Sequence, residues 1–429
     1  MNNIKEFIQL AENIVNDLGD KIIADEIGLY EAEKNILDFI NSLGNKLLEN
    51  VIKKIPEPTI ENTLELKNGI ARYRDTRPIS LKNRFGGTTT INRRSYKIIG
   101  GGSYHPLDKK LGIINCKGFT PLPTFLLALF AGTEPYESSA TKISECLGFP
   151  ISGTAVHSNT ENIGEIIYHD PINNIPSNHQ NEESELMIVE IDGTMSPQIK
   201  EVEGIKGQDV KKQPTEYKEC NVITIEKHYN KADKMRWYGA HYGKRDTFCE
   251  YARKTGLKMG QLKAAEIVFI ADGAKHNWEI QINNFPDAIP ILDFYHACEH
   301  LADFCSFLPK KKLEKQYKKW KKMIYEGEIV QVMEEMKLEL YTNISNNEEA
   351  IKHINYFDNN KNRMDYLLYK DKGYPIGSGM VEGACKFVVG KRFKNSGMRW
   401  KKADNEAVLD VRLAVINDTL HTLFEKKVA

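Results

Sequence analysis

The chain has 429 residues, enough for two or three domains that each bury a hydrophobic core. Its 59 basic and 59 acidic side chains give a formal net charge of zero, and 41% of its residues are hydrophobic, as in an ordinary globular protein. The sequence has no apolar run of membrane-spanning length, and its start lacks the basic and then apolar layout of a secretion signal, so we expect a cytoplasmic protein without a membrane partner.

The seven cysteines are scattered, and no two of them form a Cys-x-x-Cys pair. This pattern favours reduced thiols over a zinc ribbon or a redox motif. The zero net charge counts mildly against a nucleic-acid binder, but the basic residues are unevenly placed, and nucleic-acid binding depends on the local field.

Residues 1–60 are predicted to form an N-terminal helical segment, because Phe7, Leu10, Ile14 and Leu18 recur at helical spacing. Such an amphipathic pair of helices would pack on the body of the protein or on a second subunit. Residues 61–118 are predicted to form a small β-rich region, in which β-branched residues follow Thr88 and three glycines supply a turn. Three basic residues of this region either touch phosphate or form a solvated face: Arg93, Arg94 and Lys97.

Residues 119–170 are predicted to contain three helices, over 123–131, 136–147 and 152–167, with Ser152 as the N-cap of the third. Two short helices around a glycine-containing turn match a helix-turn-helix, whose last helix would face DNA base edges. Packing of three helices without DNA is the alternative. The candidate base readers are Ser158, Asn159 and Asn162.

A polar linker is predicted over residues 171–184, followed by the first part of a catalytic core over 185–303. Apolar runs predict buried strands, and the runs that end in Asp192 and Asp272 are each followed by glycine. Antiparallel strands and then alternating strands and helices indicate an α/β fold, a mixed sheet with helices on its faces.

Each Asp-Gly pair has two interpretations. Asp-Gly is a favoured turn pair, and that alone explains a single instance. Two carboxylates at neighbouring strand ends, however, do not both stay ionised cheaply unless a cation lies between them. Mg²⁺ prefers such oxygen ligands, and two ions would hold the attacking and leaving oxygens of a phosphodiester.

Residues 304–372 are predicted to be a charged helical insertion. In it, Leu313, Tyr317 and Trp320, with Ile324 as a further candidate, recur at helical spacing as a buried stripe. A lysine-rich face from Lys310 onward is either solvated or guides a phosphate backbone. Residues 373–429 form the C-terminal part of the predicted core. Here Glu382 is a lone acid, and seven Lys or Arg follow it up to Lys402. Aromatic and basic residues alternate as in nucleic-acid strips, and Trp400 either stacks on a base or fills the core. The candidate DNA contacts are Lys386, Lys391, Arg392, Lys394, Arg399, Trp400 and Lys401.

Several stretches together resemble a known family. They are Asp192-Gly-Thr194, Ala271-Asp-Gly273, Leu292 to His300, Pro375 to Lys386, and Ser396 to Trp400. With them, the chain resembles bacterial insertion-sequence transposases of the Kra type, which belong with the Mutator-like DDE transposases. The resemblance runs from about residue 75 to the C-terminus, and its specific motifs are Gly-Ser-Gly-x-Val-Glu-Gly and Ser-Gly-Met-Arg-Trp.

The resemblance implies an RNase H-like core with a helical insertion before the glutamate, and a mainly α N-terminal part with a helix-turn-helix. It assigns Asp192, Asp272 and Glu382 as catalytic residues that hold Mg²⁺ or Mn²⁺, with two ions expected. It gives Asp293 and His296 a supporting role, to which the alternative is a helix start capped by Asp293. Relatives with zinc-binding cysteine pairs exist, but this sequence lacks such pairs.

The function that we expect is DNA cleavage and strand transfer at the terminal inverted repeats of an insertion sequence. The implied partners are the transposon ends, target DNA and further copies of the chain in a homodimer or higher multimer, on the nucleoid of a bacterial cytoplasm. Two alternatives stay open: a DNA-binding protein that retains the fold without activity, and an RNase H-like nuclease without strand transfer. Two carboxylates would also suit a glycosidase, but the sequence lacks an aromatic sugar platform.

Overall fold

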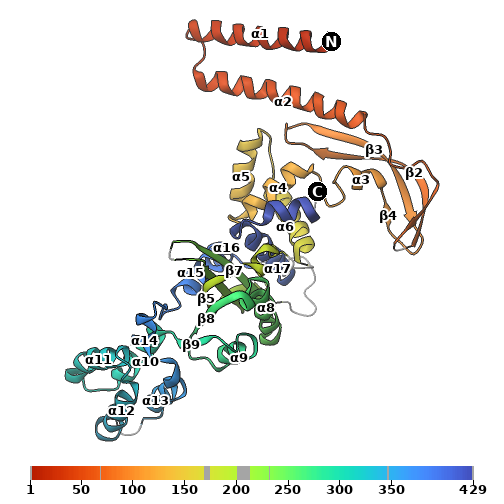
Figure 1. Ribbon diagram of the computed structural model, residues 1–429. Helices are drawn as coiled ribbons and strands as arrows, with labels where there is room; N and C mark the ends of the chain where they lie inside the picture. Colours follow the sequence, from red (N-terminus) through yellow and green to blue (C-terminus); the bar gives the residue numbers. More distant parts are fainter. Residues whose placement is uncertain are drawn as a thin grey trace. The chain divides into compact units, whose positions relative to one another are not determined.

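The computed structural model describes residues 2–67, 69–168, 174–200, 213–230, 232–344 and 347–427 (Figure 1). These residues form two compact units. The first comprises Met1–Ile163 with Phe424–Ala429, and the second comprises Gly164–Leu423. Each unit contains helices and one sheet, so the chain is mixed α/β, as the sequence predicts. Within the described residues, we find no helix of the length and apolar character that a membrane span requires.

The first unit starts with two long helices, α1 (Asn2–Ile23) and α2 (Leu29–Lys53), where the periodicity predicts helix. A four-stranded antiparallel sheet follows, in the order β1-β2-β3-β4. The strands are β1 (Thr63–Leu66), β2 (Gly69–Lys82), β3 (Thr88–Ile98) and β4 (Ser103–Tyr104). Helix α2 packs against the β2–β3 turn: a Cβ at Gly44 would lie 2.4 Å from the Phe85 ring, and the Asn45 amide donates to the Phe85 carbonyl at 2.8 Å.

Three further helices of this unit have the predicted positions. After the short helix α3 (Pro106–Lys110) come α4 (Pro121–Ala131), α5 (Tyr136–Leu147) and α6 (Gly153–Tyr168). Helix α5 ends at Gly148, whose φ of 72° favours glycine. The Ser152 hydroxyl accepts the Ala155 N–H at 3.2 Å, which is the predicted N-cap of α6. The helix-turn-helix function of these elements stays a prediction.

The second unit is built on a five-stranded sheet in the order β7-β6-β5-β8-β9. The strands are β5 (Ser184–Ile199), β6 (Thr215–His228), β7 (Lys234–Tyr242), β8 (Ala264–Ala271) and β9 (Ile289–Leu292). The first three are antiparallel neighbours, and β8 and β9 extend the sheet in parallel with β5. This is the mixed sheet that the sequence predicts.

One strand boundary was predicted wrongly. The sequence predicts that the chain turns at Gly193, directly after Asp192, but β5 continues to Ile199. The physical reason is its partner: β6 pairs with β5 without interruption from Leu186↔His228 to Ile199↔Thr215, so the backbone beyond Asp192 keeps its hydrogen bonds. Asp192 therefore lies in mid-strand, whereas Asp272 does follow the end of β8.

Helices pack against this sheet. A Cβ at Gly239 of β7 would lie 2.8 Å from Ile223 of β6 and 3.0 Å from the Tyr251 ring, so helix α8 (Arg245–Lys258) packs on that face. Helix α9 (Lys275–Asn284) follows β8, and the short elements α7 (Asn178–Asn181) and η2 (Gln261–Lys263) complete this region. Of the predicted linker over 171–184, residues 171–173 lie outside the described residues.

The predicted insertion is helical. It follows α10 (Phe294–Ser306) and comprises α11 (Lys310–Tyr325), α12 (Ile329–Asn343), α13 (Glu348–Asn360), η3 (Lys361–Arg363) and α14 (Tyr366–Asp371), drawn together in teal to blue in Figure 1. Trp320 and Ile324 of α11 are fully buried, as the stripe in the sequence predicts. Part of the lysine face is paired with α12, because Lys319 lies 2.6 Å from Glu335.

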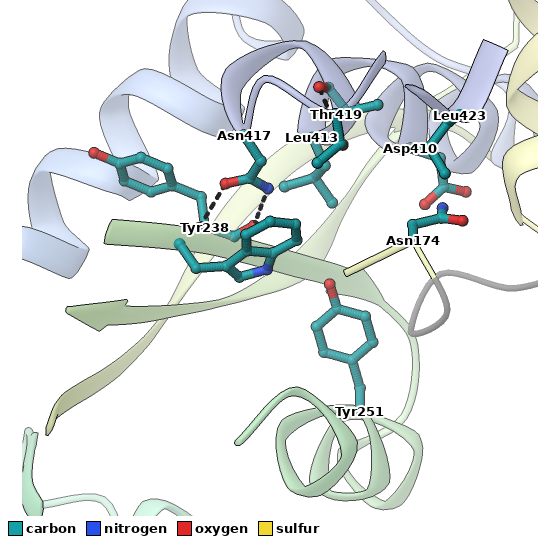
Figure 2. Close-up of a pocket in the computed structure, with 10 residues that line it drawn as sticks. Asn174, Tyr238, Tyr251, Asp410, Leu413, Asn417, Thr419 and Leu423 are labelled. Carbon is teal, nitrogen blue, oxygen red and sulfur yellow. Dashed lines mark hydrogen bonds between the residues drawn. The ribbon is translucent and has the colours of Figure 1, made fainter. Parts of the chain in front are cut away.

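The remaining, C-terminal elements of the chain are helical. They are α15 (Gly379–Ala384), the π-helical segment η4 (Cys385–Gly390), α16 (Lys391–Phe393), α17 (Lys402–Ile416) and α18 (Leu420–Lys427). Beyond α17, the Asn417 side chain accepts the Tyr238 N–H at 2.9 Å and donates to the Tyr238 carbonyl at 2.8 Å (Figure 2). This pair of bonds covers part of the outer edge of β7, which is an edge strand.

Candidate active site

Two predicted catalytic acids, Asp192 and Asp272, lie just beyond the point where the parallel pairing of β5 and β8 ends. The last paired residues of β5 and β8 are Glu190 and Ile270. Extending this register by two residues brings Asp192 level with Asp272, on strands about 4.8 Å apart. On the other side of β8, Ala271 pairs with Leu292, so Asp293 is the next residue in that row. Three acids therefore follow one another across three neighbouring strands.

Asp192 is half-buried, and both of its carboxylate oxygens have contacts. One oxygen accepts the Gly193 N–H at 2.7 Å, and the Cys385 thiol lies 3.6 Å from the other. Burial raises the pKa of Asp192 above its ordinary value, and the negative charge of Asp272 raises it further. A divalent cation between the two acids would remove this repulsion, so their electrostatics fit a metal site.

Asp272 is held by the turn that follows β8. Its Oδ1 accepts the Ala274 N–H at 2.9 Å and the Asn277 amide at 2.7 Å. The next residue, Gly273, faces the ring of Tyr356 from α13 so closely that a Cβ would lie 2.0 Å from that ring. The Tyr356 ring also stacks on His300, with 3.6 Å between ring centroids. The glycine of this Asp-Gly pair is thus required by the close approach of an insertion helix.

Glu382 lies on α15, with its side chain half-buried. It lines an open pocket of about 570 Å³ together with Asp192. The other lining residues are Thr194, Cys385, Lys386, Gly390, Lys391 and Lys394. The structure thus brings Asp192 beside Asp272 and into one pocket with Glu382. Among the described residues, these three acids do not form a group whose ligand oxygens all lie within 4.8 Å of one another.

The donor set has the chemistry of a hard-cation site. All three candidate ligands are carboxylates, and Mg²⁺ or Mn²⁺ is bound by one or two carboxylates with water and substrate oxygens completing the shell. Because substrate oxygens supply part of that shell, carboxylates that line an open pocket fit the ion without forming a closed cage.

Asp293 has two roles in the structure. It is completely buried, and its Oδ1 caps α10 by accepting the Tyr295 and His296 N–H groups at 2.6 and 2.9 Å. Its Oδ2 accepts both the backbone N–H and the hydroxyl of Ser378, in the loop before α15. The helix-cap interpretation is therefore correct, and the same carboxylate also anchors the chain that carries Glu382.

His296 is half-buried at the start of α10. Its Nδ1 lies 3.2 Å from a Glu299 carboxylate oxygen. Its charge lowers the pKa of Asp192, although less than burial raises it. A supporting role for His296 stays a prediction.

The sequence does not single out Glu190, because it lies inside an apolar run that predicts a buried strand. It is 2% exposed, and its Oε2 accepts the Val381 N–H at 2.8 Å. Burial raises the pKa of Glu190 to about 8, and the charge of Asp293 acts in the same direction. The signal in the sequence is its spacing: an acid two residues before Asp192 on a strand shares a face with it.

Four of the predicted DNA-contacting lysines are exposed: Lys386, Lys391, Lys394 and Lys401. The first three line the pocket of Asp192 and Glu382, and the Lys394 ammonium donates to the Thr194 hydroxyl at 2.5 Å.

Arg392 has a different place from the one predicted, and Trp400 takes the core position that the sequence left open. Arg392 is completely buried, Trp400 is 7% exposed, and the guanidinium lies 4.8 Å from the Trp400 ring centroid. The Trp400 indole N–H donates to the Phe393 carbonyl at 3.1 Å, so the core alternative describes this residue. Arg399 is half-buried and donates to the Gln213 carbonyl at 2.7 Å.

Two of the three predicted base readers are used inside the protein. Asn159 is 2% exposed, and its amide donates to the carbonyls of Lys117 and Ala155 at 3.2 and 2.9 Å. Asn162 donates to the Asn115 carbonyl at 2.7 Å. These amides fasten α6 to the loop before α4, whereas Ser158 is exposed.

The pocket beside Asn417 is a separate feature (Figure 2). It encloses about 20 Å³ and is lined by side chains that include Tyr251 and Asp410. This volume suits about one water molecule, so the pocket is too small for a substrate.

Comparison with known proteins finds no matching family model and no matching curated protein. Among solved structures, the chain is similar to one described as "Drosophila P element transposase strand transfer complex". The two are 11% identical, the match covers 70% of this chain and 80% of that one, and the TM-score is 0.28. A likeness at this score does not decide the fold or the function.

Proposed function

We propose that this protein is a DDE transposase of the Kra type, in which Asp192, Asp272 and Glu382 carry out metal-dependent phosphoryl transfer on DNA. The observation that supports the proposal is the position of Asp192 relative to the other two acids. Asp192 and Asp272 each lie two residues beyond the last pair of the parallel strands β5 and β8, and Asp192 shares an open pocket with Glu382.

The fold of the second unit supports an RNase H-like core. Its sheet has three antiparallel strands, β7, β6 and β5, extended by the parallel strands β8 and β9. The helices α11 to α14 lie in the chain between β9 and the helix of Glu382, which is the place of the expected insertion.

The proposed cofactor is Mg²⁺ or Mn²⁺, with two ions bound by Asp192, Asp272 and Glu382. Bound there, the ions would activate the attacking oxygen and stabilise the leaving oxygen. The residues of the chain itself hold the DNA: Lys386, Lys391 and Lys394 place positive charge around the pocket, where a phosphate backbone would lie.

We further propose that the active form is a multimer that uses α1 and α2. Ile8, Val15 and Ile22 of α1 are exposed at seven-residue intervals, the spacing of a coiled-coil seam, and α2 exposes Ile40 and Leu47 in the same way. Residues 1–53 contain ten acidic and five basic side chains, a balance that disfavours DNA as the occupant of this apolar face. A second copy of the hairpin is the occupant that we expect.

The test is cleavage of DNA that carries the inverted repeats flanking the gene, with Mg²⁺ as the metal. Asp192→Asn, Asp272→Asn and Glu382→Gln should each lower the rate at least ~100-fold, because each removes a metal ligand. Asp287→Asn, at an exposed acid beside β9, is the matched control and should keep the parental rate. Full activity in any of the three variants would refute the assignment.

The same assay separates the alternatives. A transposase yields joined products in which a transposon end is linked to target DNA, whereas a nuclease without strand transfer yields only cut ends. A protein that only retains the fold would bind the repeats and leave them uncut at every metal concentration.

A further inference from the structure

The helix that carries Glu382 lacks a cap of its own. Helix α15 continues without a break into η4 and α16, and the side chain of its N-cap residue, Ser378, makes no capping hydrogen bond. The first N–H groups of any helix have no partner within the helix and need acceptors from elsewhere. The position of Glu382 therefore depends on whatever satisfies those N–H groups.

Two acids from distant strands supply the partners. Asp293 accepts the Ser378 N–H, and Glu190 accepts the Val381 N–H at 2.8 Å. Val381 is the third residue of α15 and directly precedes Glu382, so the Glu190 bond fixes the backbone beside the proposed metal ligand. Glu190 lies two residues before Asp192 on the same face of β5, so one strand holds both Asp192 and this anchor.

Burying a carboxyl group at this position is costly, because the group gives up its hydration, which an apolar residue would not need. In the sheet, Glu190 lies between Thr224 of β6 and Ile270 of β8, and both of these residues are completely buried. The hydrogen bond from the Val381 N–H explains why a polar acceptor, Glu190, occupies this buried position.

We propose that Glu190 is a positioning residue, which holds the Val381 N–H and thereby keeps Glu382 in place opposite Asp192. The inference rests on the proposed function for its consequence, since positioning Glu382 matters for metal binding only if Glu382 is a ligand. Its structural part, the anchoring of α15 by Glu190, is measurable without any activity.

The experiment compares Glu190→Gln with Glu190→Leu in the full chain. Glutamine keeps a carbonyl oxygen for the Val381 N–H, whereas leucine has a similar size and no acceptor. Hydrogen exchange of the segment 376–390, measured by mass spectrometry without DNA or metal, should be at least ~10-fold faster in Glu190→Leu and close to parental in Glu190→Gln. Glu185→Gln, at an exposed position of β5, is the control.

The functional arm measures the Mg²⁺ concentration that gives half-maximal DNA cleavage. Glu190→Leu should raise it at least ~10-fold, with unchanged DNA affinity in Ca²⁺, and Glu190→Gln should restore most of the parental value. If leucine and glutamine behave alike, or if exchange of the segment is unchanged in Glu190→Leu, the positioning role is wrong.

Two further results keep the inference separate from the proposed function and from misfolding. If the parent shows no metal-dependent cleavage, the proposed function fails, and the exchange experiment still decides whether Glu190 anchors α15. If Glu190→Leu does not fold, Val381→Pro removes the same bond from the donor side, in the first turn of the helix, where this N–H has no intrahelical partner. It should then show the same raised Mg²⁺ requirement, and a parental requirement in it would overturn the proposal.

Discussion

Asp293 accepts hydrogen bonds from both the backbone N–H and the hydroxyl of Ser378, a residue 85 positions further along the chain. The same carboxylate caps α10 through the Tyr295 and His296 N–H groups. One buried side chain thus ties the end of β9 and the start of α10 to the loop before Glu382, and the insertion helices begin and end near it.

Removal of this carboxylate should destabilise the second unit. Asp293→Ala loses the helix cap and leaves buried N–H groups without partners, so the free energy of unfolding should fall by about 2 to 4 kcal/mol. Ser378→Ala keeps the backbone bond and should cost only about 1 kcal/mol. Urea unfolding of both variants measures the difference, and equal losses would contradict the shared role of Asp293.

Gly273 should not tolerate a side chain while Tyr356 is present. A Cβ at this position would lie 2.0 Å from the Tyr356 ring, so Gly273→Ala should lower the free energy of unfolding by about 1 to 3 kcal/mol. In a Tyr356→Ala background the same change should cost clearly less, because its obstacle is gone. A double-mutant cycle by urea unfolding tests this, and strictly additive effects would argue against the contact.

The exposed lysines at the pocket should act through phosphate. Lys386→Gln or Lys391→Gln should each weaken binding to every DNA sequence alike and reduce the slope of log affinity against log salt by about 0.9. Lys263→Gln, at the opposite end of β8 from Asp272, is the control and should leave the slope unchanged. Arg392→Gln should instead lower stability, because Arg392 is buried.

Glu182 should contribute to the loss of stability as the pH falls below 5. Burial alone would raise the pKa of Glu182, but hydrogen bonds from Tyr229, His179 and Asn178 lower it to about 2. In the unfolded chain the pKa is about 4.3. The folded state therefore gains stability from the ionised form above about pH 4.3, and loses that gain as the pH falls towards 2.

Accordingly, Glu182→Gln should cost about 1 to 2 kcal/mol at pH 6 and less at pH 3, where the parent has lost part of its own advantage. Urea unfolding at both pH values measures the two differences. A cost that stays the same at pH 3 and pH 6 would show that the ionised form of Glu182 is not what stabilises the fold.

The α1–α2 hairpin should control the oligomeric state. Replacing Ile8, Val15 and Ile22 by serine removes three exposed apolar residues of the proposed seam without touching the catalytic unit. Sedimentation should then show a smaller assembly than the parent at equal concentration. The same three-serine protein should keep its secondary structure by circular dichroism, and an unchanged sedimentation coefficient would exclude this seam as the contact.

Much of the local structure follows from the sequence. Apolar runs and helical spacing predicted the strands that contain Val189 and Phe269 and the buried stripe of Trp320 and Ile324, because such patterns reflect local geometry and burial. The extent of β5 beyond Asp192 was not predictable in this way, since it depends on pairing with residues 215–221 of β6.

The sequence by itself therefore identified the candidate acids, Asp192, Asp272 and Glu382, and the resemblance of the chain to a family. Tertiary structure alone decided which polar side chains face the pocket and which serve the fold: Arg392, Asn159 and Trp400 are buried, whereas Lys386 is exposed. It also revealed Glu190 as the partner of Val381, 191 positions away in the chain. The physical reason is that burial and hydrogen bonding between distant segments are set by packing, which leaves no periodic trace in the sequence.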